Sequence, residues 1–161
     1  MRRIKQIAAF GKKLMASEDV ESTLELISGE AKTLLDAERC SIFIVDKEDK
    51  MLWTKISDGI GRIVISLDAG IVGETYMQQK PQVVNSPYDN TKFLPSIDKK
   101  SGYVTKNLIT VPIFDSKREV IGVIQLLNKY RFDFDDKDLE NLTFFANYVS
   151  GSLELALSAE L

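Results

Sequence analysis

Four short apolar runs, rich in β-branched residues, constrain the fold of this chain more than any other feature. Cys40–Val45 and Met51–Ile56 are separated by five polar residues, and so are Leu108–Phe114 and Val120–Leu127. Strand-length runs joined by short charged turns form antiparallel hairpins. The first run is apolar at successive positions, which predicts a strand buried on both faces.

Amphipathic helical patterns flank these hairpins. Apolar residues recur every three or four positions in 4–15, from Val20 to about Ala37, and from Asp135 to about Leu157. We expect Ser17 to cap the second helix, because a serine followed by acidic residues suits a helix N-terminus.

The last predicted helix carries more apolar surface than one face needs. A heptad-like seam is accompanied by three aromatic residues outside it. The seam consists of Leu139, Leu142, Ala146, Val149, Leu153 and Ala156, and the aromatic residues are Phe144, Phe145 and Tyr148. Two interpretations stay open: both stripes cover the sheet, or one of them binds a partner helix.

The middle of the chain is less regular. Ile63–Ile65 is a short predicted strand, Gly70–Gln79 is a predicted helix that Pro81 ends, and 82–107 is predicted to be irregular. Because most strands are joined by hairpins, the sheet should be largely antiparallel, with helices packed on it. The predicted fold class is α+β.

Two residue counts limit the chemistry. The chain has no histidine and a single cysteine, Cys40. Histidine is the commonest metal ligand and general base, and structural zinc sites need several Cys or His ligands. We therefore expect no metal site and no catalytic residues. One cysteine forms no intramolecular disulfide, which fits a reducing, cytoplasmic location.

Charge and hydropathy disfavour two classes of partner. A net charge of -3 and a pI of ≈ 5.1 give no general attraction to nucleic acid or anionic membranes. The apolar run 7–10 is too short for a signal peptide or a membrane span. We expect neither nucleic-acid binding nor membrane contact.

An ordered series of motifs carries a family resemblance. The motifs are Ser41-Ile42-Phe43 with Asp46, Gly70-Ile71-Val72-Gly73, Asp98–Leu108, Val111-Pro112-Ile113, Val120–Val123 and Asn128-Lys129. Together they resemble GAF domains, particularly those of cyclic-nucleotide phosphodiesterases and cyanobacterial-type adenylyl cyclases. The resemblance implies a PAS-related central antiparallel sheet. The N- and C-terminal helices would cover one face, and short helices and loops would cover a ligand pocket on the other.

The resemblance also implies a domain organisation and a structural salt bridge. Residues 1–15 would be a signalling or dimerisation helix, and 17–158 the GAF core within a single domain, 1–161. Cyclic-nucleotide-binding members carry Asn-Lys, then Phe, three residues and Asp-Glu. This chain has Asn128, Lys129, Phe134 and Asp138, but Leu139 replaces the Glu. Lys129 and Asp138 should form an ion pair.

Ligand-binding positions are carried over from the family by matching motifs. They are Ser41, Asp58, Ile71, Val72, Phe93, Asp98, Ser101 and Thr105. A carboxylate at 98 can accept from a purine edge, and hydroxyl groups suit exocyclic or ribose oxygens. The helix near Gly70 would direct its N–H groups at a phosphate. Each polar residue also has a structural interpretation, as a turn or cap. Ser57 and Leu94 stand where phosphodiesterase relatives place aromatic residues.

The resemblance implies a regulatory, small-molecule-sensing domain of a multidomain signalling protein. Cyclic AMP or cyclic GMP is the candidate ligand, and occupancy would be relayed through terminal helices that form a homodimer. The alternative is a ligand-free module for dimerisation and signal relay. Family members that reduce methionine sulfoxide use several cysteines, so this chain is predicted to be non-enzymatic.

Overall fold

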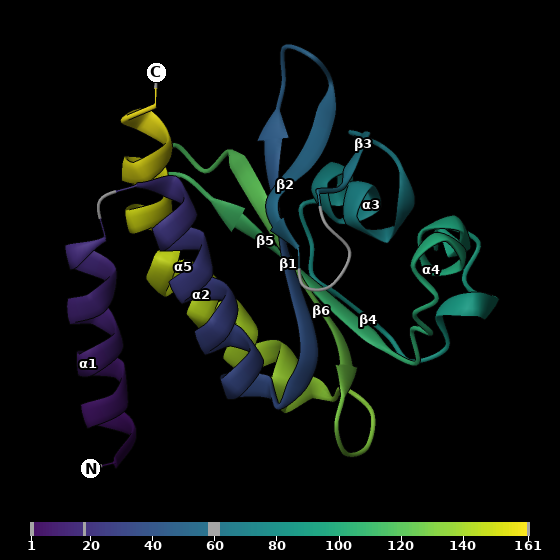
Figure 1. Ribbon diagram of the computed structural model, residues 1–161, viewed down its shortest axis with the longest axis horizontal. Helices are drawn as coiled ribbons and strands as arrows, with labels where there is room; N and C mark the ends of the chain where they lie inside the picture. The colour runs from purple at the N-terminus through teal and green to yellow at the C-terminus, as the bar shows by residue number, and fades with distance from the viewer. Residues whose placement is uncertain (1, 18, 58–61, 161) are drawn as a thin grey trace.

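The molecule is built in layers around one sheet (Figure 1). The computed structural model describes residues 2–17, 19–57 and 62–160. Helices α2 (Val20–Leu35) and α5 (Asp136–Ser158) cover one face of the sheet, and α1 (Arg2–Ala16) lies outside them. Helices α3 (Gly70–Gln78) and α4 (Pro95–Ser101) lie on the other side. The predicted α+β class is confirmed.

All neighbouring strands of the six-stranded sheet are antiparallel, in the order β3-β2-β1-β6-β5-β4. The two predicted hairpins are β1/β2 and β5/β6, and the pairing of β1 with β6 joins them at the sheet centre. The strands are β1 (Ala37–Asp46), β2 (Met51–Ser57), β3 (Val64–Ser66), β4 (Gln82–Val84), β5 (Leu108–Phe114) and β6 (Val120–Lys129).

The two faces of the central strands differ in character. Successive side chains of a strand point to opposite faces. Cys40, Ile42 and Ile44 of β1 belong to the large core beneath α2 and α5, whereas Ser41 and Phe43 face α3 and α4. One face therefore carries a continuous apolar core, and the other includes polar groups.

The start of α2 differs from the prediction. Asp19, not Ser17, is the N-cap, and its carboxylate accepts a hydrogen bond of 2.7 Å from the Ser22 amide. The Ser17 hydroxyl instead donates to the Leu14 carbonyl at 2.7 Å. A carboxylate is a strong acceptor and favours the positive end of the helix, which leaves Ser17 to close α1.

The segment 82–107 is more regular than predicted. It contains the edge strand β4, the 3-10 helix η1 (Pro87–Asp89) and α4. These elements are too short to show periodicity, with three residues in β4 and seven in α4. The local signals are nevertheless present: Pro95 begins α4, and Gly102 ends it with a φ of 78°.

The two apolar stripes of α5 have different partners. Leu142, Ala146, Val149 and Leu153 are buried, as in a stripe that covers the sheet. The ring of Phe145 lies 5.6 Å from that of Phe10 in α1. Phe144 and Tyr148 stay 65% and 42% exposed, so the second stripe is only partly covered.

Among the described residues, no helix combines the length and apolarity needed to cross a bilayer.

Gly73 lets α3 lie against the turn that precedes it. A Cβ atom at this position would lie 2.5 Å from the Asp68 carbonyl carbon and 3.0 Å from its Cα atom. Backbone atoms at this distance cannot move away without shifting the helix. The glycine is therefore required by a close approach of two backbone segments.

We predict that Gly73→Ala lowers the free energy of unfolding by about 1–3 kcal/mol, the usual range for overpacking. The matched control is Gly151→Ala in α5, where a Cβ atom meets no heavy atom within 4 Å. That substitution should stabilise the protein by about 0.5–1 kcal/mol, because alanine favours helix. Urea denaturation measures both. Equal effects of the two variants would contradict the close approach.

Candidate functional site

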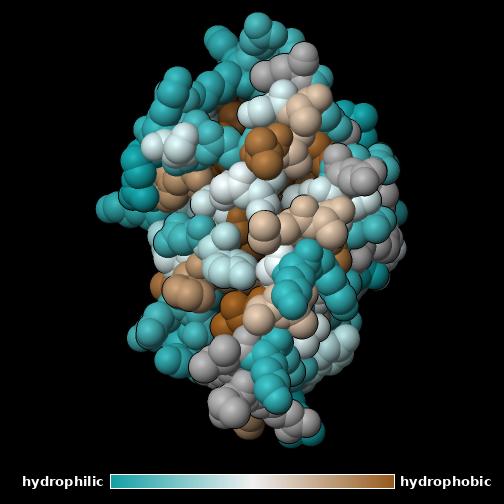
Figure 2. Space-filling model, turned by 90° about the vertical axis from the view of Figure 1, so that its left-hand side faces the viewer, coloured by the Kyte–Doolittle hydropathy of each residue, from teal (hydrophilic) through white to brown (hydrophobic). Residues whose placement is uncertain are grey.

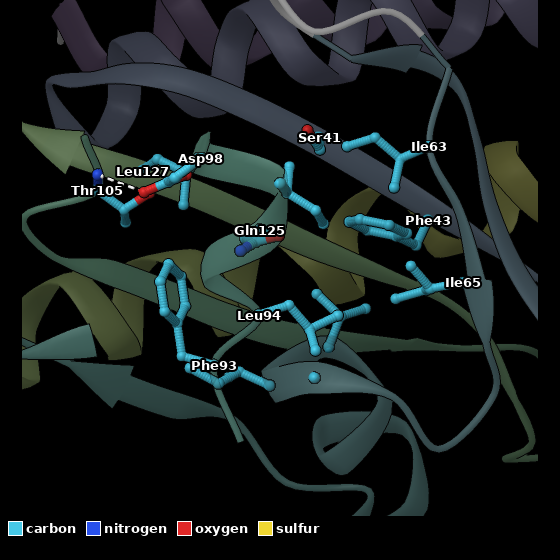
Figure 3. A pocket seen from close by; sticks show the side chains of 14 residues that line it. Ser41, Phe43, Ile63, Ile65, Phe93, Leu94, Asp98, Thr105, Gln125 and Leu127 are labelled. Carbon is cyan, nitrogen blue, oxygen red and sulfur yellow. Dashed lines mark hydrogen bonds between the residues drawn. The ribbon is translucent and has the colours of Figure 1, made fainter. Parts of the chain in front are cut away.

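A small hollow lies between the sheet and the segment that contains α4 (Figure 3), with a volume of ≈ 50 Å³. Strands β1 and β6 form its floor, and β3 and the start of α3 form its sides. Residues 86–105, here called the roof segment, cover it. The lining residues are Ser41, Phe43, Ile63, Ile65, Gly70, Ile71, Val72, Phe93, Leu94, Ile97, Asp98, Thr105, Gln125 and Leu127.

Four polar side chains converge on this otherwise apolar hollow. Ser41 and Gln125 come from directly opposed positions on β1 and β6, and Asp98 and Thr105 come from the roof segment. Figure 3 shows Gln125 at the centre of the floor, between Ser41 and Leu94. A concave apolar surface with a few convergent polar groups is the usual form of a small-molecule site.

Asp98 holds the roof segment together. Its carboxylate is 6% exposed and accepts hydrogen bonds from the Thr105 amide at 2.8 Å, the Thr105 hydroxyl at 3.0 Å and the Tyr88 hydroxyl at 2.5 Å. Because this carboxylate accepts a hydrogen bond from the protonated Tyr88 hydroxyl, it raises the pKa of that hydroxyl. In the part of the chain that the structure describes, the donors to this buried carboxylate all belong to its own segment.

Leu94 covers the beginning of α3. Its side chain lies 3.0 Å from the position that a Cβ atom of Gly70 would occupy. The N-cap residue, Ala69, makes no side-chain hydrogen bond to the first turn. An apolar side chain therefore lies over the helix end where the sequence predicts a phosphate.

The structure brings most of the predicted ligand-binding positions together. Ser41, Ile71, Val72, Phe93, Asp98 and Thr105 all line the hollow. Ser101 does not: it is exposed, and its hydroxyl donates to the Ile97 carbonyl of its own helix at 3.1 Å. Ser101 is the last residue of α4, where carbonyl groups of the helix need donors. Asp58 lies outside the described residues.

Gln125 is the polar lining residue that sequence reasoning missed. Strand β6 is otherwise apolar from Val120 to Leu127, so a glutamine within it was a detectable signal. It alternates with Val123 and Leu127, and it lies opposite both Ser41 and Thr110 in the sheet. Its amide both donates and accepts, which suits the edge of a heterocyclic base.

The predicted ion pair is present at the end of β6. Lys129 Nζ lies 2.6 Å from Asp138 Oδ2, and the two side chains are 18% and 10% exposed. The same Asp138 oxygen accepts from the Asp135 amide at 3.0 Å, as part of a capping box of α5. One carboxylate thus fastens a central strand to the first turn of α5.

Asn128 connects this strand end to the roof segment. Its side-chain oxygen accepts from the Lys106 amide at 2.6 Å, and its nitrogen donates to the Val104 carbonyl at 2.9 Å. Residues 128 and 129 therefore link the end of the roof segment to α5 through consecutive hydrogen bonds.

The described residues offer little to redox or metal chemistry. Cys40 is buried on the face of β1 that contacts α2 and α5, away from the hollow. A buried apolar setting makes a thiol unreactive. Among residues 2–17, 19–57 and 62–160, no group of three or more cysteine and acidic side chains is arranged to hold a metal ion.

Comparisons with known proteins find related sequences and similar folds. The family model described as "GAF domain" matches residues 19–153. The chain is 29% identical over 140 residues to a probable 3',5'-cyclic phosphodiesterase, pde-5, of Caenorhabditis elegans, covering 78% of the chain. It is 34% identical over 133 residues to the dual 3',5'-cyclic-AMP and -GMP phosphodiesterase 11A of Takifugu rubripes, covering 70% of the chain.

These relatives are much longer than the chain, which spans 19% and 14% of their lengths. A solved structure of similar extent is the GAF domain from an Acinetobacter phosphoenolpyruvate-protein phosphotransferase. It has a TM-score of 0.82 at 17% identity, and the match covers 99% of this chain and 98% of that one. At this identity, the likeness concerns the fold alone.

We predict that Asp138→Asn lowers the free energy of unfolding by about 2 kcal/mol, since it removes the charged group to which the largely buried Lys129 Nζ is hydrogen-bonded. The control is Glu140→Gln, which removes an ion pair with Lys137 on the same helix. That pair is 3.8 Å long, and its side chains are 65% and 74% exposed. It should cost no more than about 0.5 kcal/mol. Chemical denaturation distinguishes the two, and similar small losses would argue against a stabilising role for Lys129.

Proposed function

This chain belongs to the GAF domain family, and we propose that it is a non-catalytic regulatory module that senses a small molecule for a larger, cytoplasmic signalling protein. The observation that carries the proposal is the convergence of Ser41, Gln125, Asp98 and Thr105 on one apolar hollow. The similarity to two cyclic-nucleotide phosphodiesterases supports cyclic AMP or cyclic GMP as the ligand.

Ligand entry requires movement of the roof segment. Pockets for small molecules usually have volumes of roughly 300–1,000 Å³, whereas the hollow measures ≈ 50 Å³. Phe93, Leu94 and Ile97 line it from the roof segment. In the described conformation the hollow is therefore too small for such a molecule, and binding selects or induces a conformation with these side chains withdrawn.

A ligand can replace one of the hydrogen-bond donors of Asp98. In the described conformation the Asp98 carboxylate accepts from Tyr88 and Thr105. A purine edge carries amino and imino donors that can replace the Tyr88 hydroxyl without leaving the buried charge unpaired. The Gln125 amide, on the floor of the hollow, would form hydrogen bonds with other donor and acceptor groups of the purine.

Occupancy is relayed to the terminal helices through the end of β6. The roof segment is bonded to Asn128, and the adjacent Lys129 is bonded to Asp138 at the start of α5. A roof segment displaced by ligand pulls on this junction and biases α5 and the helix that lies against it, α1. The size of the effect equals the difference in ligand affinity between the two helix arrangements.

We predict that Gln125→Met weakens cyclic-nucleotide binding about tenfold, because it removes a hydrogen-bonding group and keeps the side-chain volume. The matched control is Gln78→Met, at an exposed position of α3 outside the hollow, which should leave the affinity unchanged. Isothermal titration with cyclic AMP and cyclic GMP measures both. Absence of heat from the unaltered protein at millimolar nucleotide would remove the nucleotide proposal.

A second proposed function is dimerisation through the terminal helices, and a specific surface favours it. Figure 2 shows apolar side chains gathered along the middle of the face on which α1 lies. A groove of ≈ 220 Å³ runs between α1, α2 and α5 and includes Ile7, Leu34, Phe144 and Tyr148. Each of these four is more than two-fifths exposed. A second copy of the chain, docked through α1 and α5, would cover them.

We predict that the protein dimerises and that Phe144→Ser raises the dimer dissociation constant at least about tenfold, since aromatic residues at an interface centre dominate binding. The control is Phe132→Ser, because Phe132 is 88% exposed in the β6–α5 loop, away from α1. Sedimentation velocity over a concentration series measures both variants. A protein that stays monomeric at every concentration would exclude this function.

A further inference from the structure

Two buried polar atoms in stacked side chains retain unused hydrogen-bonding capacity. Among the described residues, Arg39 Nη1 and Tyr103 Oη are the buried side-chain atoms for which the geometry gives no hydrogen-bond partner. The Asn128 side chain lies close enough to the Tyr103 oxygen to lower the pKa of its hydroxyl, so the capacity that stays unused at Tyr103 is that of the hydroxyl as a donor. The two side chains belong together, since the Arg39 guanidinium carbon lies 3.7 Å from the centre of the Tyr103 ring. Buried polar atoms are nearly always hydrogen-bonded, and leaving one unpaired destabilises a fold. Two such atoms at one place indicate a site rather than an accident of packing.

This pair adjoins the hollow. Arg39 lies two residues before Ser41 on β1, and so on the same face of the sheet, and it is directly opposite Leu127 of β6. Ser41 and Leu127 both line the hollow. Tyr103 lies in the roof segment two residues before Thr105 and contacts the cluster formed by Ile71, Leu108 and Leu127. The pair therefore stands where the roof segment returns to the sheet.

Both groups are donors in the physiological range. The guanidinium of Arg39 stays protonated and has no acceptor. Burial, aided by the negative charge of Glu38, raises the pKa of the Tyr103 hydroxyl to about 12, so this group keeps its proton. A positive charge beside a hydroxyl donor selects an acceptor that carries negative charge, because such hydrogen bonds are the stronger kind. The first turn of α3, the alternative anion site, is covered by Leu94 in the same structure.

We propose that Arg39 and Tyr103 bind the oxyanionic group, such as a phosphate, of the small molecule that this domain senses. The inference rests on the proposed sensing function and adds the class of ligand: an anion whose apolar or heterocyclic part enters the hollow. A neutral molecule of the same shape lacks the group that the stacked pair requires and binds less tightly.

Stability of the ligand-free protein gives the first test. A side chain whose polar atom has no partner should be replaceable by an apolar one at little cost. Tyr103→Phe removes only the hydroxyl and keeps the ring on which Arg39 stacks. The thermal midpoint of this variant should equal that of the unaltered protein or exceed it, whereas a purely structural role for the hydroxyl would lower the midpoint. Arg39→Met also removes the cation over the ring, which is stabilising by itself, so this variant is used only in the binding test.

Calorimetric titration gives the second test. The probes are cyclic GMP, cyclic AMP, the uncharged nucleosides guanosine and adenosine, and inorganic phosphate, all at matched ionic strength. Arg39→Met should weaken binding of the charged probes about 10- to 100-fold, and Tyr103→Phe about 3- to 10-fold, with nucleoside binding unchanged. The matched control is Arg118→Met, since Arg118 also stacks on an aromatic ring, 4.8 Å from the centre of Phe114, in the β5–β6 turn. It should bind every probe like the unaltered protein.

The outcomes separate this inference from the function on which it rests. If nucleotides and nucleosides bind the unaltered protein and Arg39→Met equally well, the hollow binds small molecules but the anion site is wrong. If phosphate alone binds, and only with Arg39 present, the anion site stands and the nucleotide proposal fails. If no charged probe distinguishes the unaltered protein from Arg39→Met, including the case in which none binds, the anion site is overturned.

Discussion

A buried carboxylate must be surrounded by donors, and this requirement controls the side of the molecule on which the hollow lies. Asp98 satisfies it within the roof segment, through the Thr105 amide and hydroxyl and the Tyr88 hydroxyl. These bonds join Tyr88, Asp98 and Thr105 within one segment. On the proposed function, a molecule that opens the roof and separates Tyr88 from Asp98 has to provide a donor in exchange, because a buried carboxylate that loses one of its three donors is destabilised.

The two faces of the sheet are covered in different ways. Beneath α2 and α5 the core is continuous and apolar, and residues such as Ile42, Ile124 and Leu142 are almost fully buried. On the other face, the roof segment is held by its own hydrogen bonds, by the contact of Leu94 with Gly70 and by the bonds to Asn128. Movement of the roof therefore leaves the main core undisturbed. The Lys129–Asp138 pair connects the two sides, since it joins the strand that carries Asn128 to the helix that covers the core.

The elements that could be predicted from sequence are those whose pattern repeats over several turns or strand positions. The central hairpins were recognisable because strand-length apolar runs such as Cys40–Val45 are joined by short charged turns, and the long helix that starts at Asp135–Asp136 because the seam of α5 contains enough repeats to reveal a period. Strand β4 and helix α4 contain too few residues for that. Ser17 and Asp19 are both suitable caps by residue type, and the structure shows that Asp19, the stronger acceptor, is the N-cap of α2. Family motifs identified most of the residues that line the hollow, but not the hydrogen bonds that each of them makes. Whether Asp98 bonds a ligand or Thr105, and whether Ser101 points inward, depends on side-chain directions that spacing alone does not fix.

The groups in the hollow and the proposed anion site beside it differ in the hydrogen bonds they require, and on that proposal this difference restricts the ligand more than its volume does. In the hollow Asp98 accepts, whereas Arg39 and Tyr103, which lie beside the hollow, offer donors. Gln125, which does both, lies on the floor of the hollow, and Ser41 lies beside it, about 6–7 Å along β1 from Arg39. A molecule with donors on one edge and an oxyanion on the other satisfies every one of these groups at once. A molecule with the reverse polarity leaves a carboxylate facing an anion and two donors facing donors. Since a buried unpaired polar group costs about 1–3 kcal/mol and a charged one more, reversed ligands are excluded by the cost of desolvation even where their shape fits.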